Sequence, residues 1–212
     1  MKIPTLSADL IDALRSRFFA KDRSIYLAAN CLAYLSNGAY LSNAFISETV
    51  LSASATGVTF SNIPQGFRTL LLTCDIRTDA ALELDTITLR FNGDSGANYD
   101  TQTLFGSAAT TGAGATRATA LNSTLLSEAA NSRAKTFSPN IVFIPNYANS
   151  SAEKRAIAFN LFYGNLSADA DLLAGMRTVG WRNTNVITTL VIVPDNGPNF
   201  VSGSRFQLYG IL

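Results

Sequence analysis

Residues able to carry out acid–base or nucleophilic chemistry are scarce in this sequence. None of its 212 residues is histidine, which excludes Ser-His-Asp and Cys-His nucleophiles and His-containing zinc sites. It also lacks the glycine-rich phosphate loop G-x-x-x-x-G-K-[ST] and the nucleophile elbow G-x-S-x-G. The two cysteines, Cys31 and Cys74, match no metal-binding or redox spacing, so we expect both to be buried and reduced.

Carboxylate pairs are the remaining candidates for catalysis, because a glycosidase needs only two carboxyl groups. Glu83 and Asp85 alternate onto one face of a predicted strand, and Asp169 and Asp171 do so if their loop is extended. Both pairs lie in polar surroundings at strand ends or loops, which is typical of solvated surface. We therefore predict a protein with no catalytic residues and no cofactor.

Oxygen ligands for a cation are offered by Asn92, Asp94, Asn98 and Asp100, which lie close together in a glycine-rich turn. This spacing lacks the glutamate that closes an EF-hand calcium loop. Asn and Asp in such turns normally bond backbone groups instead. The prediction is a structural turn without a metal.

Exposed aromatic residues offer another kind of site, because aromatic rings stack on sugars. A host-surface glycan is thus a further candidate partner, although a core position is at least as good an explanation for the tryptophan. The candidate platform residues are Tyr99, Tyr147, Tyr163, Trp181 and Tyr209.

These candidates are positioned by a succession of predicted β-strands. The segments are short, rich in β-branched or aromatic residues, and bounded by Gly, Asn, Pro or Asp. Alternation predicts one buried and one wet face in residues 84–91, and the same signal recurs at Phe159, Leu161 and Tyr163 and at Phe206, Leu208 and Gly210. The predicted strands are 45–51, 57–60, 69–76, 86–91, 141–144, 155–163, 177–181, 186–193 and 205–212.

The fold class predicted from these strands is all-β. No helical period intervenes between them, which disfavours parallel βαβ folds, and about eight or nine antiparallel strands suggest a β-sandwich of jelly-roll type. Residues 106–132 interrupt the pattern because they are small, polar and poor in large apolar side chains, so we predict a long loop there. The sandwich domain is predicted to span residues 45–212.

Residues 1–44 are predicted to form an arm in front of this domain. Ser7 is a good N-cap for a helix over about residues 8–19. A hairpin centred on Asn37-Gly38, or a second helix over 25–35, is predicted to follow. The helix is marginal alone, so its apolar stripe must pack on its own domain or on a neighbouring subunit. That stripe consists of Leu10, Ile11, Leu14 and Phe18.

Composition limits the choice of partners. Hydrophobic residues make up 47% of the chain and charged residues 15%, below the roughly 25% that is usual. Such a chain has too few charges to coat every face, so some of its surface is expected to meet other protein. With a net charge of +1 and no basic run, no nucleic-acid partner is expected. The sequence has no apolar run long enough to span a membrane and no signal peptide, so we expect assembly in a cytoplasm.

Three segments, taken in order, resemble a β-sandwich module of structural proteins from tailed bacteriophages. The first runs from Asn62 to Phe67, the second from Phe91 to Tyr99, and the third from Gly203 to Gly210. The resemblance covers residues 45–212 and leaves the arm out. In this interpretation the second segment and an arginine hold the fold together, with Arg205 pairing with Asp94 or Asp75. The structural turn motif comprises Phe91, Asn92, Gly93, Asp94, Gly96, Asn98, Tyr99 and Arg205.

The resemblance implies a virion protein whose partners are other capsid or tail proteins. A capsid decoration or cement protein anchored by its arm is favoured, and a homotrimer would match capsid three-fold sites. A tail fibre or receptor-binding protein is the alternative, although no repetitive shaft is present. A phage glycan-cleaving enzyme or carbohydrate-binding module is the third hypothesis.

Overall fold

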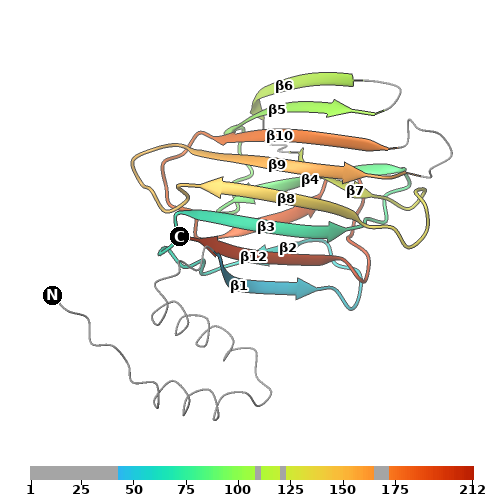
Figure 1. Ribbon diagram of the computed structural model, residues 1–212, viewed down its shortest axis with the longest axis horizontal. Coiled ribbons are helices and arrows are strands. Elements are labelled where there is room, and N and C mark those ends of the chain that lie inside the picture. The colour runs from blue at the N-terminus through green and yellow to red at the C-terminus, as the bar shows by residue number, and fades with distance from the viewer. Residues whose placement is uncertain (1–42, 108–110, 120–122, 165–171) are drawn as a thin grey trace, which may run out of the picture.

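The protein is an all-β antiparallel sandwich of two sheets, which confirms the predicted fold class at that level (Figure 1). The computed structural model describes residues 43–107, 111–119, 123–164 and 172–212. In these ranges no helix is long and apolar enough to cross a membrane. The nine segments predicted as strands all contain strand residues.

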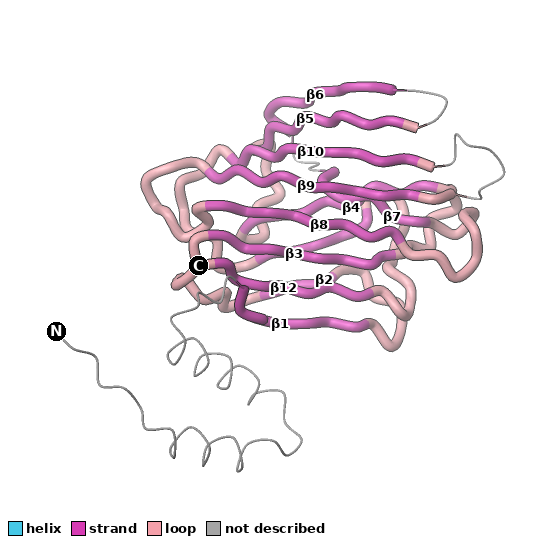
Figure 2. The backbone as a smooth tube through the Cα atoms, in the orientation of Figure 1, coloured by secondary structure: helices cyan, strands magenta, loops and turns pink. Residues whose placement is uncertain are grey.

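The larger sheet has eight strands and the smaller sheet has four, and neighbouring strands within each sheet are antiparallel (Figure 2). In spatial order the larger sheet consists of β1 (Asn43–Val50), β12 (Arg205–Ile211), β3 (Thr69–Ile76), β8 (Ser138–Pro145), β9 (Lys154–Phe162), β10 (Leu173–Trp181), β5 (Tyr99–Gly106) and β6 (Thr111–Thr119). The smaller sheet consists of β2 (Val58–Phe60), β11 (Leu190–Pro194), β4 (Leu84–Phe91) and β7 (Ser123–Glu128).

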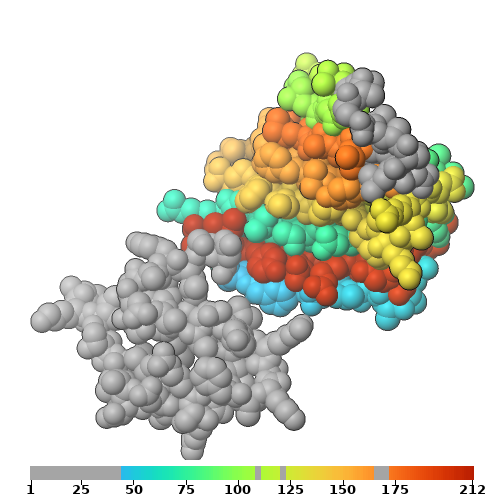
Figure 3. All heavy atoms as spheres, turned by 45° about the vertical axis from the view of Figure 1, so that its right-hand side comes forward, coloured from blue at the N-terminus to red at the C-terminus, as the bar shows by residue number. Residues whose placement is uncertain are grey.

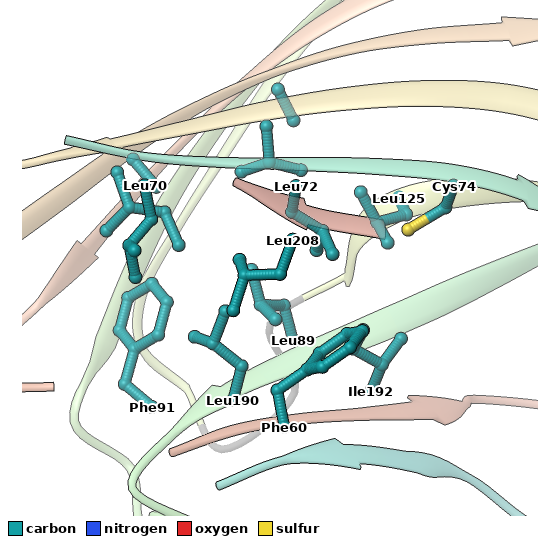
Figure 4. Close-up of a cluster of buried hydrophobic side chains, with 14 of the residues drawn as sticks. Phe60, Leu70, Leu72, Cys74, Leu89, Phe91, Leu125, Leu190, Ile192 and Leu208 are labelled. Atoms are coloured by element: carbon teal, nitrogen blue, oxygen red, sulfur yellow. The ribbon is translucent and has the colours of Figure 1, made fainter. Parts of the chain in front are cut away.

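The core lies between the two sheets because alternate residues of each strand point into it. Leu70 and Leu72 of β3 and Leu208 of β12 are fully buried, and they face Leu89 of β4 and Leu190 of β11 across the sandwich (Figure 4). Burying each such side chain contributes about 1.5–3 kcal/mol relative to leaving it exposed. The predicted alternation is confirmed in β12. It is confirmed in β4 except at Thr88, which is buried although it lies on the predicted wet face.

The smaller sheet does not reach one end of the larger one. In Figure 1 the four strands lie behind the middle and lower strands of the larger sheet, whereas β5 and β6 extend past them. The β5–β6 hairpin forms a narrow ridge in Figure 3. Phe105 is accordingly exposed although it lies on the core side of β5, and β6 is exposed along most of its length.

Residues 106–132 were predicted as a loop, and this prediction is wrong for most of them. The segment contains the whole of β6 and β7, and β5 immediately before it was also missed. Gly, Ala and Thr in β6 give no hydrophobic alternation, and the strand instead takes its place by pairing with β5, where Gly112 lies opposite Phe105. Glycine suits this position because a Cβ there would lie 2.4 Å from the Phe105 ring.

β7 was not predicted for a different reason: the backbone groups along its free edge are hydrogen-bonded by side chains from the other sheet. The Asn140 amide donates to Leu126 O at 2.9 Å and accepts from Leu126 N–H at 3.0 Å. Ser138 Oγ accepts from Glu128 N–H at 2.8 Å, and Asn160 donates to Thr124 O at 3.3 Å. Such an edge needs no strand partner, because polar side chains from β8 and β9 satisfy its backbone.

The predicted arm lies outside the described residues up to Ser42. This applies to the helix at 8–19 with Leu10, Ile11, Leu14 and Phe18, to the hairpin or helix that follows it, to Cys31, and also to Asp169 and Asp171. The last two arm positions, Asn43 and Ala44, belong to β1.

Candidate functional site

The predicted turn motif joins β4 to β5, and its central carboxylate is fully engaged. Asp94 accepts hydrogen bonds from Trp181 Nε1 at 2.7 Å, from Gly96 N–H at 2.8 Å and from the Asn98 amide at 2.9 Å. Desolvation by itself would raise the pKa of Asp94, but these three donors outweigh it and hold the pKa below its ordinary value. The carboxylate therefore fastens the turn to β10.

Asn92 makes a second set of hydrogen bonds from the same turn. Its Oδ1 accepts from Thr188 N–H at 2.8 Å and Thr189 N–H at 3.1 Å, and its Nδ2 donates to Val186 O at 2.8 Å. Its φ of 52° and the φ of 70° at Gly93 are left-handed values that Asn and Gly adopt most readily. The turn residues are thus selected by backbone geometry and by contacts to the segment before β11.

The aromatic members of the motif are buried beneath the turn. The Tyr99 hydroxyl donates to Asp94 O and accepts from Phe91 N–H, both at 3.1 Å, and burial raises the pKa of Tyr99 to about 12. Phe91 packs edge-on against Trp181 with ring centroids 5.8 Å apart. Trp181, Tyr99 and Tyr147 are all buried, so these three candidates do not form an exposed sugar platform, and Trp181 takes the core position that was the alternative explanation for it. Tyr163 remains exposed and Tyr209 half-buried.

Arg205 does not reach this turn. It lies opposite Asp75 in the β12–β3 ladder, but its ion pair is with Glu48 of β1, at 3.8 Å between Nε and Oε1. The suggested partner Asp94 is bound to Trp181 instead. Arg205 therefore contributes at the β1 edge of the sandwich, far in the chain from the motif to which the sequence assigned it.

Asp85 was predicted to be solvated, and this prediction is wrong. Its side chain is fully buried, and it accepts from the Asn196 amide at 2.8 Å and from Asn196 and Gly197 N–H groups, both at 3.2 Å. Asp79 binds Asn199 in the same way, at 2.7 Å from its amide and 2.9 Å from its N–H. Both carboxylates fasten the loop before β12, and Glu83 remains exposed.

A buried lysine closes the opposite end of the sandwich. Lys154 Nζ donates to three carbonyls, those of Asn149 at 2.5 Å, Ala152 at 2.7 Å and Thr184 at 2.9 Å. Burial lowers the pKa of Lys154. Burial likewise raises the pKa of the Cys74 thiol, which lies in the core as predicted. Among the described residues, no three His, Cys, Asp or Glu side chains come together as a metal site.

The outer face of the larger sheet, turned away from the core, carries large apolar side chains. The strand register aligns apolar residues across it. Ile141 of β8 lies opposite Phe159 of β9, which lies opposite Met176 of β10, then Leu104 of β5 and Ala113 of β6. Large apolar side chains thus form a continuous row across neighbouring strands.

This row lines a hollow, which we call the outer groove. Its volume is about 840 Å³, and Leu161 and Ala174 complete the row's lining toward one end. The side chains are well exposed: Phe159 by 46%, Leu104 by 45%, and both Ile141 and Leu161 by 42%. Of the residues that line the groove, none is charged. Such a surface has the chemistry of a protein interface.

A second row continues the apolar surface toward β1. Phe45, Tyr209, Leu71, Phe143 and Ile157 lie opposite one another in successive strands. The rings of Phe45 and Tyr209 meet edge-on with centroids 5.7 Å apart. This second row therefore carries apolar side chains from β1 to β9.

This surface was not predicted, because the alternation of Phe159, Leu161 and Tyr163 suggested that these residues form the buried face of their strand. That assignment is wrong: all three are exposed, and Ala156, Ala158 and Asn160 face the core. The difference in size between the residues on the two faces of the strand could have indicated this arrangement. A strand whose two faces are both apolar, one with small and one with large side chains, can bury either one.

Comparison with known proteins gives little guidance on function. No protein-family model and no curated protein matches the chain. Among solved structures, the chain is similar to exo-inulinase from Aspergillus awamori over 83% of its own length and 30% of that chain, with 9% sequence identity and a TM-score of 0.33. Similarity at this level says nothing about activity.

Proposed function

We propose that this protein is a structural, non-enzymatic component of a bacteriophage virion, assembled in the host cytoplasm. A capsid decoration or cement protein anchored by the N-terminal arm is the favoured form. The observation that carries the proposal is the outer groove: a broad apolar surface on an otherwise complete sandwich. Contiguous exposed apolar surface of this kind is typical of protein-binding sites.

The polar residues support the same proposal. Among the described carboxylates, Asp79, Asp85 and Asp94 each accept amide hydrogen bonds that tie loops together. The oxygens of these carboxylates are occupied by hydrogen bonds within the fold. Their arrangement supports a scaffold more than an active site.

The groove also favours protein over sugar as the partner. Sugar sites combine an aromatic ring with several polar groups that bond the hydroxyls. The outer groove is lined mainly by aliphatic side chains, and its only polar lining residues are Thr111 and Asn160. Asn160 already bonds Thr124 O and Asn140 Oδ1. The receptor-binding and carbohydrate-binding alternatives are accordingly less well supported.

A jelly-roll origin for the sandwich is part of this proposal. If β5, β6, β9 and β10 are set aside, β1, β3, β8 and β12 remain in the larger sheet and β2, β4, β7 and β11 form the smaller one. Along the chain these eight strands alternate between the sheets except at β4 and β7, which follow one another in the smaller sheet. Double-sheet jelly rolls of this kind occur in viral capsid and lectin domains. Because this fold serves both functions, the proposal is based on the outer groove and not on the fold.

The decisive experiment locates the protein in purified phage particles. Antibody labelling and quantitative mass spectrometry should place it on the capsid in many copies, and sedimentation should show a closed homo-oligomer, with a trimer expected. A few copies at the tail would support the fibre alternative. Absence from particles, or release of reducing ends from host polysaccharide, would overturn the proposal.

A further inference from the structure

The outer groove extends across β8, β9, β10, β5 and β6 and needs an apolar partner. We propose that it binds the apolar stripe of residues 8–19 from a second copy of this chain. The inference rests on the proposed function, since it names the partner that an assembly protein would place in this groove.

The dimensions of the groove suit a short helix lying across the strands. Neighbouring strands are about 4.8 Å apart, so the five strands of the groove span roughly 19 Å. A helix over residues 8–19 would be about 18 Å long at 1.5 Å per residue. One helix of the predicted length would therefore cross the groove from end to end.

The chemistry of the two surfaces also matches. A helix over 8–19 would place Leu10, Leu14 and Phe18 in one line, with Ile11 beside them. Anchors at these spacings are the usual pattern of a helix that docks in a hydrophobic groove. The groove has no charged lining residue, and the charged Asp9 and Asp12 of the segment would lie away from it.

The length of chain before the sandwich allows this contact. The segment joins the body at Asn43, the first residue of the edge strand β1. From there the middle of the groove lies about five strand spacings away, or roughly 24 Å. Residues 20–42 can extend to about 75 Å, so the helix could reach a groove on its own body or on a neighbour.

A second copy is the occupant that fits the proposed function. If the helix covered the groove of its own chain, both apolar surfaces would be used internally and neither would be left for assembly. If it binds the next copy, every chain offers one helix and one groove. Head-to-tail contacts of this kind close into rings such as trimers when the rotation between neighbouring copies closes.

Cross-linking in the full-length protein tests the proposal. A variant with Leu14→Cys and Met176→Cys, in a Cys31→Ser background, is treated with a short bismaleimide. Cys74 is buried and will not compete. Covalent dimers and trimers are expected on a denaturing gel. Only intramolecular product, or no product, would overturn the inference.

The matched control moves the second cysteine to Thr59, an exposed position on β2 of the smaller sheet. Leu14→Cys with Thr59→Cys should give at least tenfold less covalent oligomer. Equal yields from the two variants would mean random collision and would contradict docking in the groove.

A second comparison needs no cysteine. Leu14→Asp places a charge in the apolar stripe, whereas Ser16→Asp places the same charge on the opposite side of a helix over 8–19. Leu14→Asp should convert the oligomer to monomer in sedimentation, and Ser16→Asp should leave it intact. If both or neither dissociate, the helix does not bind as proposed.

These results are independent of the particle experiment. If the protein forms cross-linked oligomers but is absent from virions, the binding of the helix in the groove is supported and the proposed virion function is wrong. If the protein is present in virions but its Leu14→Cys/Met176→Cys variant yields no intermolecular product, the virion function is supported and the binding of the helix in the groove is wrong.

Discussion

Strands β3 and β9 of the larger sheet both alternate, yet the residues at their centres that face the core differ in size. In β3, Leu70 and Leu72 face the core and are fully buried. In β9 the core side carries Ala156 and Ala158, and the larger Phe159 points outward. The difference follows from what lies opposite: β3 faces the bulky centre of the smaller sheet, whereas β9 lies near β7, whose edge is hydrogen-bonded to side chains of β8 and β9.

The comparison shows that alternation predicts two faces but does not say which one is buried. A solvated outer face would carry polar residues, as antiparallel sheets commonly do. The outer face of β8–β10 is instead apolar and rimmed by polar edges, so it resembles a second core side that lacks its cover. This is why we propose a binding function for this face.

The largest stability effect is expected for a core residue of β3. Leu72→Ala should lower the free energy of unfolding by about 3–5 kcal/mol, because the cavity forms in a fully packed layer. Its neighbour Leu71 points to the outer face, so Leu71→Ala should cost far less. Urea denaturation of both variants provides the measurement, and equal losses would contradict the assignment of faces.

The next largest effect is expected at Asn140. Asn140→Ala removes the side chain that bonds both backbone groups of Leu126 and also accepts from Asn160. Leaving these buried groups unpaired should cost roughly 2–4 kcal/mol. Hydrogen exchange should show faster exchange of the β7 amides in particular. Unchanged protection of Leu126 N–H would mean that β7 is not held by this side chain.

A smaller effect is expected at the turn carboxylate. Asp94→Ala leaves the buried Trp181 Nε1 without its acceptor, and should destabilise the fold by about 1–3 kcal/mol. The exposed neighbour Ser95 provides the control, since Ser95→Ala should change stability by less than about 0.5 kcal/mol. Chemical denaturation followed by tryptophan fluorescence reports directly on Trp181.

The contribution of Asp94 to the free energy of unfolding should decrease at acidic pH. The pKa of Asp94 is lowered in the folded protein, so its contribution is complete above its unfolded pKa of about 3.9 and is lost as pH falls through the folded value. The stability difference between the native protein and Asp94→Ala should therefore narrow below about pH 4. Asp100, whose pKa is also lowered by hydrogen bonds from Arg182, is present in both proteins and does not alter the difference. A gap that stayed constant down to pH 2 would contradict this view.

The smallest stability effect is expected on the outer face, where association should respond instead. Phe159→Ala removes a side chain that is nearly half exposed, so its cost should stay below about 1 kcal/mol. Because Phe159 lies in the middle of the outer groove, the same change should weaken self-association at least tenfold in sedimentation. If Phe159→Ala destabilised the monomer as much as Leu72→Ala, the outer face would be part of the core.

The sandwich was predicted from β-rich segments, and strands were correctly proposed at 69–76 and 205–212, where large apolar residues recur at alternate positions. The prediction failed for β5, β6 and β7. In β6, Gly112 and Ala113 give no periodic signal, and in β7 the buried Ser127 and Glu128 look like loop residues. Both strands form through partners distant in the sequence, which no local pattern contains.

The candidate site was predictable in its residue types but not in its location. Asn92, Gly93 and Asp94 suit a tight turn because of backbone geometry alone. Their partners Trp181 and Thr188 lie about ninety positions away in the chain and were not predicted. Arg205 was predicted to pair with Asp94 or Asp75, but its ion pair is with Glu48. The groove was missed altogether, because it exists only where five strands lie side by side.

The amino-acid sequence by itself determined that the protein is all-β, that histidine-based chemistry is excluded, and that its surface has few charges. These properties depend on residue type and local spacing, which the chain carries without folding. The tertiary structure alone decided which face of each strand is covered, which carboxylates are buried as ties, and that Ile141, Phe159, Met176 and Leu104 meet in one groove. These depend on strand order and register, which are set by contacts between residues far apart in the chain.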